Sequence, residues 1–129
     1  MYIVLALGNP GVEYKNTRHN VGYRVVERIV YENKVKFKIS RGTFQYAVVK
    51  DKLEKSPSFI IAKTLTFMNL SGIAAKDLLE EFKESTSSLI VVHDDIDLDI
   101  GTLKIKKDGG SGGHKGIESI FNALGAKNL

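Results

Sequence analysis

Apolar and polar residues follow one another in blocks along this chain, and the spacing within each block predicts its secondary structure. Residues 2–7 form an unbroken apolar run of strand length, and a second run, Leu89-Ile-Val-Val92, follows Ser88 in the predicted strand at residues 88–92. Runs without polar alternation are typical of strands that are covered on both faces. From Val21 onward, apolar residues recur at helical spacing with charged residues between them, which predicts a helix from about His19 to Tyr31.

Shorter blocks in the rest of the chain predict further strands and two more helices. β-Branched and aromatic residues favour strands at residues 36–39, 43–49, 58–61 and 102–106, with a hairpin turn at Gly42 and a loop at residues 54–57. Ser71 is expected to cap a helix that ends near Glu84, and a last helix is expected to end at Gly125. No internal repeat or low-complexity tract divides the chain, so we expect a single domain over residues 1–129.

Composition narrows the class of protein. With 129 residues, 43% of them hydrophobic and 26% charged, the chain has the balance of one soluble globular domain. The absence of cysteine excludes disulfides and thiolate chemistry and is compatible with a reducing cytoplasm. The first apolar run is too short for a signal peptide or a membrane span. A net charge of +4 permits an anionic partner without requiring one.

Polar residues follow both doubly apolar runs, where open α/β sheets place their ligands. Asn9 follows the first run, and His93 and Asp94 follow the second. His19 is either an exposed or capping residue or a general base, because imidazole titrates near neutrality and a carboxylate can fix its tautomer. Asp94 supplies that carboxylate if the two strands are neighbours. No cysteine or suitably placed serine offers a nucleophile, so water is the expected attacker.

The glycine-rich stretch at residues 109–116 does not match a known phosphate loop. A P-loop starting at Gly109 requires glycine where His114 stands and serine or threonine where Gly116 stands, and a dinucleotide fingerprint requires glycine in place of Lys115. The stretch is therefore either a flexible loop or a loop shaped for another close approach.

The acidic run after residue 93 imitates a calcium loop without completing it. Asp95-x-Asp97-x-Asp99 matches the start of an EF-hand, but Ile100 replaces the glycine and Lys106 replaces the final glutamate. We therefore do not expect calcium to bind here.

Other polar residues have both ordinary and functional explanations. Asn9 can form a turn, Asn69 can start a helix and His114 can lie on the surface, but together these neutral groups suit a substrate made of amides and esters. Lys104, Lys106 and Lys107 are either the solvated edge of a strand or a phosphate-binding track.

Five motifs together closely resemble those of bacterial peptidyl-tRNA hydrolases, in the same order and over almost the whole chain. They are Gly8-Asn-Pro-Gly-Val-Glu-Tyr14, Thr17-Arg-His-Asn-Val-Gly22, Phe67-Met-Asn-Leu-Ser-Gly72, Val92-His-Asp-Asp-Ile-Asp-Leu98 and Gly109-Gly-Ser-Gly-Gly-His-Lys-Gly116. The resemblance implies an α/β fold with a mixed central sheet flanked by helices on both faces. It also implies hydrolysis, without metal or cofactor, of the ester that joins a peptide to the 3′ ribose of tRNA.

The resemblance also implies a role for individual residues. His19 is the general base that activates water, Asp94 holds and polarises His19, and Asn9 assists catalysis. The other implied residues bind the two parts of the substrate. The peptide side is assigned to Asn9, Phe67, Met68, Asn69, His114 and Lys115, and tRNA phosphates to Arg18, Lys104 and Lys106.

Two features depart from the family pattern. Lys115 stands where the family commonly has asparagine, so a group that donates and accepts becomes a cation that only donates. Relatives continue past the last predicted helix with another strand and a helical segment, and we expect the lack of that strand to expose a sheet edge. Self-association of this chain is then expected, whereas the full-length family is expected to be monomeric. A non-catalytic RNA-binding relative of the same fold is the alternative function.

Overall fold

The computed structural model describes residues 2–50, 59–94 and 114–125, and its centre is a five-stranded mixed sheet. The strand order is β2-β3-β4-β1-β5. β1 (Tyr2–Ala6) lies parallel to both β4 (Phe59–Thr64) and β5 (Leu89–Val92). β2 (Lys38–Ile39) and β3 (Phe44–Val49) continue the sheet in antiparallel pairing beyond β4. The mixed sheet implied by the resemblance is therefore confirmed.

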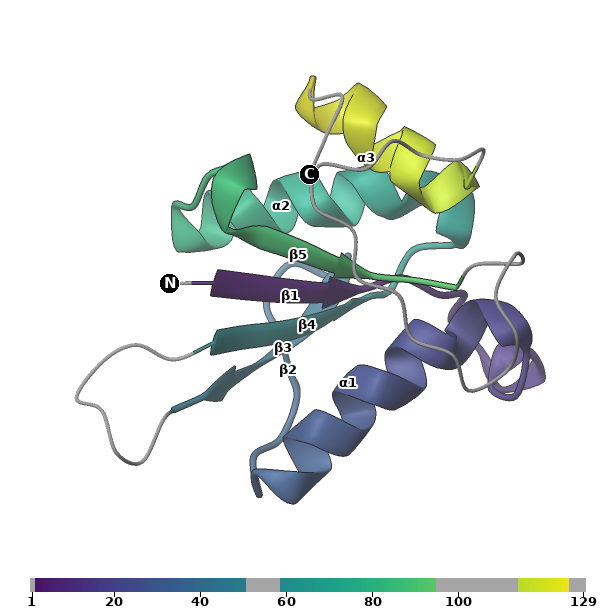
Figure 1. The fold of residues 1–129 in the computed structure, drawn as a ribbon, viewed down its shortest axis with the longest axis vertical. Coiled ribbons are helices and arrows are strands. Elements are labelled where there is room, and N and C mark those ends of the chain that lie inside the picture. Colours follow the sequence, from purple (N-terminus) through teal and green to yellow (C-terminus); the bar gives the residue numbers. More distant parts are fainter. Residues whose placement is uncertain (1, 51–58, 95–113, 126–129) are drawn as a thin grey trace.

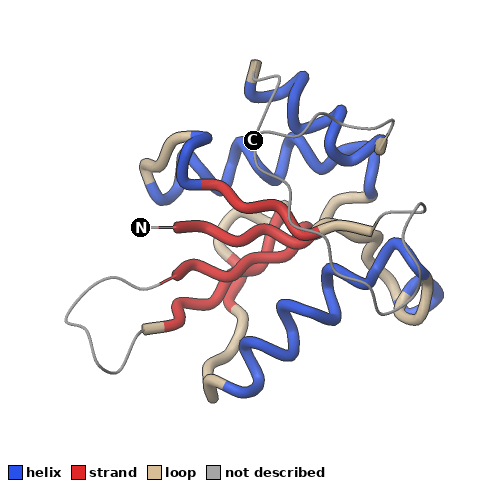
Figure 2. Tube along the Cα trace, in the orientation of Figure 1, coloured by secondary structure: helices blue, strands red, loops and turns tan. Residues whose placement is uncertain are grey.

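Helices cover both faces of this sheet, as Figure 1 shows. α1 (Val21–Glu32) lies on one face, and α2 (Ser71–Phe82) and α3 (Lys115–Leu124) lie together on the other. The helices and strands form separate layers in the tube view of Figure 2. No helix among the described residues has the length and apolar character needed to cross a membrane.

Alternating strand residues build a separate core on each face of the sheet. Ile3 and Leu5 of β1 join the cluster beneath α2 and α3, whereas Ala6 joins the cluster beneath α1. In β4 the same division places Ile60 in the first cluster and Ile61 in the second. This period of two is the consequence of strand geometry, and it fixes which face each helix must cover.

Four short 3₁₀ turns complete the described elements. They are η1 (Val12–Tyr14), η2 (Arg18–Asn20), η3 (Met68–Leu70) and η4 (Thr86–Ser88).

Most predicted helices and strands are confirmed, and two details are wrong. Ser71 does not cap α2: it is the first helical residue, and its hydroxyl donates to the carbonyl of Met68. β5 is not covered on both faces, because Ile90 is 45% exposed. The predicted loop at residues 54–57 and strand at residues 102–106 lie outside the described residues.

Candidate active site

The carboxyl ends of β1 and β5 lie side by side at one edge of the fold. The two strands are parallel neighbours, and the amide of Leu7 donates to the carbonyl of Val92 at 3.0 Å, just beyond the end of β1. Asn9 follows the first strand and Asp94 follows the second, so both residues emerge from the same edge. The structure thus meets the condition for Asp94 to serve a site shared with the turn after β1.

The start of α1 approaches these strand ends closely because residue 22 is glycine. A Cβ atom at Gly22 would lie 2.7 Å from the carbonyl oxygen of Val92 and 3.1 Å from that of Leu7. A side chain there would push the helix away from the backbone. The glycine therefore holds η2, which carries His19, against the end of β5.

His19, Asp94 and His114 meet in one cluster. His19 Nδ1 lies 2.8 Å from Asp94 Oδ2, and His114 Nε2 lies 2.8 Å from Asp94 Oδ1. The carboxylate is buried with 2% of its side chain exposed, whereas 52% of the His19 side chain is exposed. One buried carboxylate is therefore shared by two imidazoles, of which His19 faces solvent.

The environment of Asp94 keeps it ionised. Burial favours the neutral acid, but the hydrogen bond from His114 and the close contact of the His19 imidazole outweigh it and lower the pKa of Asp94 from 3.8 to about 2. Near neutral pH the group is a carboxylate that can only accept hydrogen bonds.

His114 is held in one tautomer by the helix that it begins. It is the N-cap of α3, and its Nδ1 accepts from the backbone amides of Gly116 at 3.1 Å and Ile117 at 3.3 Å. Because Nδ1 is the acceptor, the proton lies on Nε2, which donates to Asp94 Oδ1. The two ring nitrogens thus have different partners, a carboxylate at Nε2 and backbone amides at Nδ1.

His19 has the arrangement that a general base requires. Asp94 is ionised, so the facing Nδ1 of His19 carries the proton and Nε2 keeps its lone pair. The Nδ1–Oδ2 distance is that of an ion pair, but the N–H bond is not aligned with Oδ2, which has no linear hydrogen bond among the described residues. The exposed ring can rotate into line, and Nε2 is then free to accept a proton from water.

The same three side chains offer a possible metal-ligand set. One ligand atom from each lies within 4.8 Å of the others. Coordination by His114 Nε2 would move its proton to Nδ1, which already accepts from two backbone amides. The tautomer that caps α3 therefore does not fit a bound ion, and the cluster suits proton transfer better than metal binding.

Asn9 joins the turn after β1 to η3. Its Oδ1 accepts from the backbone amide of Met68 at 2.6 Å, which leaves its Nδ2 as the group available to donate. Asn69, the next residue of η3, is exposed. The two asparagines assigned to the peptide therefore lie on segments that one hydrogen bond connects.

An aromatic pair lies at this connection. The rings of Tyr14 and Phe67 pack edge to face with centroids 6.0 Å apart, and Phe67 is half exposed. Met68, by contrast, is buried: a Cβ atom at Gly116 would lie 2.6 Å from its sulfur. Phe67 thus offers an apolar surface, whereas the Met68 side chain supports the start of α3.

The remaining predicted residues are only partly described. Lys115 is exposed at the first position of α3, directly after His114. Arg18 lies in η2 beside His19. Lys104 and Lys106 lie outside the described residues.

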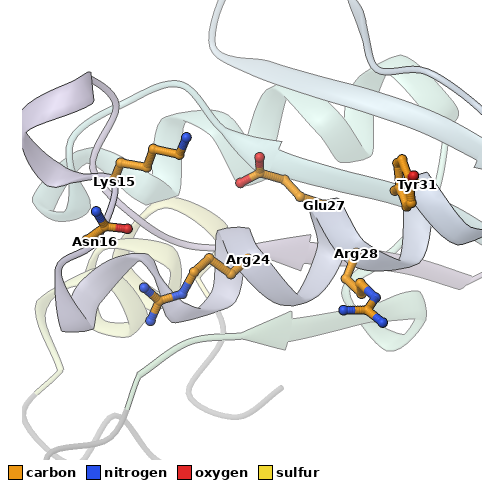
Figure 3. Close-up of a pocket in the computed structure, with 6 residues that line it drawn as sticks. All are labelled: Lys15, Asn16, Arg24, Glu27, Arg28 and Tyr31. Carbon is orange, nitrogen blue, oxygen red and sulfur yellow. The ribbon is translucent and has the colours of Figure 1, made fainter.

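Two hollows open near the turn that precedes α1, and neither is lined by His19 or Asp94. One, of about 300 Å³, lies beside Asn9 and includes Tyr23 and Thr64 in its wall. The other, of about 400 Å³, lies along the outer side of α1, shown in Figure 3. Its lining combines basic, acidic and aromatic side chains: Lys15, Asn16, Arg24, Glu27, Arg28 and Tyr31.

Sequence reasoning assigned no role to three residues around the cluster. Asn20 binds the backbone of Asn9, Tyr14 packs on Phe67, and His93 donates from Nδ1 to the carbonyl of Asp94 at 2.6 Å. Each lies inside a quoted motif, but only the three-dimensional contacts separate it from its neighbours. The position of Asn20, directly after the candidate base, was the one available signal.

Comparisons with known proteins identify relatives of this chain by sequence and by fold. The family model for peptidyl-tRNA hydrolase matches residues 3–129. A peptidyl-tRNA hydrolase of Thermodesulfovibrio yellowstonii is 45% identical over all of this chain, which spans 68% of that relative, and one of Aquifex aeolicus is 43% identical, with 65% spanned. A crystal structure of peptidyl-tRNA hydrolase from Acinetobacter baumannii superposes with a TM-score of 0.88 at 25% identity, covering all of this chain and 64% of that one.

Sequence, fold and the order of the motifs thus agree over the whole length compared. The chain belongs to the peptidyl-tRNA hydrolase family.

Proposed function

We propose that this chain hydrolyses the ester bond between a peptide and the 3′ ribose of tRNA. The observation that carries the proposal is the contact of His19 Nδ1 with a buried, ionised Asp94, in a half-exposed ring whose Nε2 has no partner among the described residues. Family membership supplies the substrate class.

The reaction needs no group beyond water and these side chains. His19 Nε2 accepts a proton from water as its oxygen attacks the ester carbonyl, and Asp94 stabilises the imidazolium that forms. The bond from the carbonyl carbon to the ribose oxygen then breaks, and His19 returns the proton to that oxygen. The products are a peptide with a free carboxyl group and a tRNA with a free 3′ hydroxyl.

Asn9 and Asn69 suit the peptide side of this substrate. Asn9 Nδ2, which has no hydrogen-bond partner in the part of the chain that the structure describes, can donate to a peptide or ester carbonyl, and the exposed amide of Asn69 can both donate and accept. Phe67 adds an apolar surface. Because these groups recognise backbone amides and carbonyls, the site binds peptides of different sequence.

The tRNA side is assigned to basic residues. We infer that Arg18, Lys104 and Lys106 contact phosphates, with Lys115 next to the cluster as a further cation. Each phosphate contact releases a counterion, so affinity falls as salt rises. Replacing Lys104 and Lys106 with glutamine should make the plot of log affinity against log salt shallower, by about 2 in the magnitude of its slope.

Hydrolysis of N-acetyl-aminoacyl-tRNA by the purified chain tests the activity. We expect turnover in the parent and a loss of about 10²–10⁴-fold in His19→Ala, with tRNA affinity retained. Lys76→Ala, an exposed change on α2, is the control and should keep full turnover. A parent that binds tRNA without turnover would overturn the hydrolase proposal and favour the RNA-binding alternative.

Self-association is a separate proposal. Among the described residues β5 pairs only with β1, and its Ile90 is half exposed, so this edge can pair with a second copy. Sedimentation velocity measures the outcome, and a monodisperse monomer would contradict the proposal.

A further inference from the structure

Asn20 lies directly after His19 and is turned toward Asn9 rather than toward its own helix. It is 3% exposed and occupies the N-cap position of α1, yet its side chain makes no capping hydrogen bond. Asparagine is among the preferred N-cap residues, and a satisfied cap contributes about 1 kcal/mol. Asn20 therefore forms hydrogen bonds elsewhere in the fold in place of the cap that it could provide for α1.

Both polar groups of that amide bind the backbone of Asn9. Asn20 Oδ1 accepts from the Asn9 amide at 2.7 Å, and Asn20 Nδ2 donates to the Asn9 carbonyl at 2.9 Å. The Asn20 side-chain amide therefore pairs with the N–H and the C=O of one residue, as a neighbouring strand does in a β-sheet. We propose that Asn20 is a positioning residue that fixes Asn9 relative to His19, and this role rests on the proposed function.

The space around the Asn20 amide is fitted to it. A Cβ atom at Gly8 would lie 2.7 Å from Asn20 Oδ1 and 2.8 Å from the ring of Tyr23. The Tyr23 hydroxyl is itself held by the carbonyl of Thr64, with both groups buried. The amide is thus enclosed on the side of Gly8 and cannot easily shift away from Asn9.

The effect of Asn20 continues through Asn9 to η3. Asn9 Oδ1 accepts from the amide of Met68 at 2.6 Å, so the orientation of the Asn9 side chain depends on where its backbone is held. One buried amide therefore links the turn of the candidate base, the turn of Asn9 and the segment that carries Asn69. Catalysis is sensitive to such placement, since a displacement of about 1 Å can cost about 10²-fold in rate.

Replacing Asn20 with alanine tests the proposal, and Asn33→Ala is the matched control. Asn33 lies at the other end of α1 and donates one hydrogen bond from its side chain to the carbonyl of Ile29 at 2.8 Å. In folded Asn20→Ala we expect kcat to fall by about 10-fold or more. The acidic limb of the pH–rate profile should stay in place, because the contact of His19 with Asp94 does not involve Asn20. Asn33→Ala should keep its turnover.

A double-mutant cycle distinguishes positioning from a general loss of structure. If Asn20 acts through Asn9, adding Asn20→Ala to Asn9→Ala should lower kcat little further. Fully additive losses would overturn the proposal.

Hydrogen exchange at the Met68 amide gives a readout that does not depend on turnover. Asn9 Oδ1 protects this amide, so its exchange should accelerate by about 10-fold or more in Asn20→Ala and stay unchanged in Asn33→Ala. Where Asn20→Ala does not fold, Asn20→Asp replaces it. Aspartate keeps the acceptor for the Asn9 amide and loses the donor, so the exchange of the Met68 amide should again accelerate. Unchanged exchange would overturn the positioning role, whereas accelerated exchange in a chain without turnover would leave it standing and remove only the proposed function.

Discussion

His114 joins Asp94 to the amino end of α3 through the two nitrogens of one ring. Nε2 donates to Asp94 Oδ1 at 2.8 Å, while Nδ1 accepts from the first amides of the helix. Positive helix-terminal dipoles thus face the side of the ring opposite the carboxylate. Capping and orientation of Asp94 are therefore properties of the same side chain, and substitution can separate them.

The first prediction separates these two roles of His114. His114→Ala removes both the cap and the donor, so it should lose about 1 kcal/mol of stability and lower kcat. Asparagine can cap a helix, but its shorter side chain does not span the distance from α3 to Asp94. His114→Asn should therefore recover most of the stability without recovering kcat. Thermal unfolding and single-turnover rates measure the two effects, and recovery of both by asparagine would contradict the separation.

A second prediction concerns the stability of the fold in acid. The pKa of Asp94 is lowered in the folded state, so its contribution is fully present above about pH 4 and is lost as the pH falls toward about 2. The shift corresponds to roughly 2 kcal/mol at most. Urea unfolding between pH 2 and pH 6 measures this loss against Asp94→Asn, in which the pH dependence should be weaker. Equal pH dependence in the two proteins would show that Asp94 is not the group responsible.

A third prediction concerns the close approach at the start of α1. Gly22→Ala adds a Cβ that would lie 2.7 Å from the carbonyl oxygen of Val92, and backbone cannot move aside as a flexible side chain does. We expect a loss of about 1–3 kcal/mol and a fall in kcat, because the helix carries η2 and His19 away from Asp94. Val30→Ala, a buried change near the other end of α1, costs a similar amount of stability and should keep kcat. Equal turnover in the two variants would show that this contact does not place the base.

The layers of the fold were predictable because apolar periodicity responds directly to burial. The apolar runs of β1 and β5 and the helical spacing of apolar residues in α1 each indicate which surface of the element is buried. The meeting of His19 with Asp94 followed from a general rule about neighbouring parallel strands together with the motifs. These inferences needed only the direction of each element.

The details that were wrong or not predicted depend on contacts that periodicity does not record. Ser71 suits an N-cap by type, but it is the first residue of α2, and its hydroxyl donates to the carbonyl of Met68 in the preceding turn, η3. Asn20 occupies an N-cap position and binds Asn9 instead, because Gly8 leaves room for its amide. His114 caps α3 although histidine is not a preferred cap. The partner of Asn20 lies 11 residues away along the chain, whereas the partners of Ser71 and His114 lie within 3 residues, so for these two the local backbone conformation rather than the residue type decides the contact.

Lys115 gives the last prediction, because its charge is unfavourable for the helix that it begins. It is exposed at the first position of α3, where the amino-terminal dipole repels a cation by about 0.3–1 kcal/mol at low salt. Lys115→Asn should therefore raise stability slightly. If the lysine contacts a phosphate or the substrate carbonyl, the same change should lower tRNA affinity or turnover, and a phosphate contact would also lower the salt slope by about 1.

Lys76→Asn, an exposed change on α2, is the binding control for this test. This control also removes one positive charge, but on α2 and not next to His114 and the cluster. The tRNA affinity and its salt dependence should therefore not change. Fluorescence titration with tRNA at several salt concentrations, together with thermal unfolding, measures both effects. Unchanged affinity and unchanged turnover in Lys115→Asn would exclude a functional role for the lysine. Its unfavourable interaction with the dipole of α3 would then have no compensating contact with substrate.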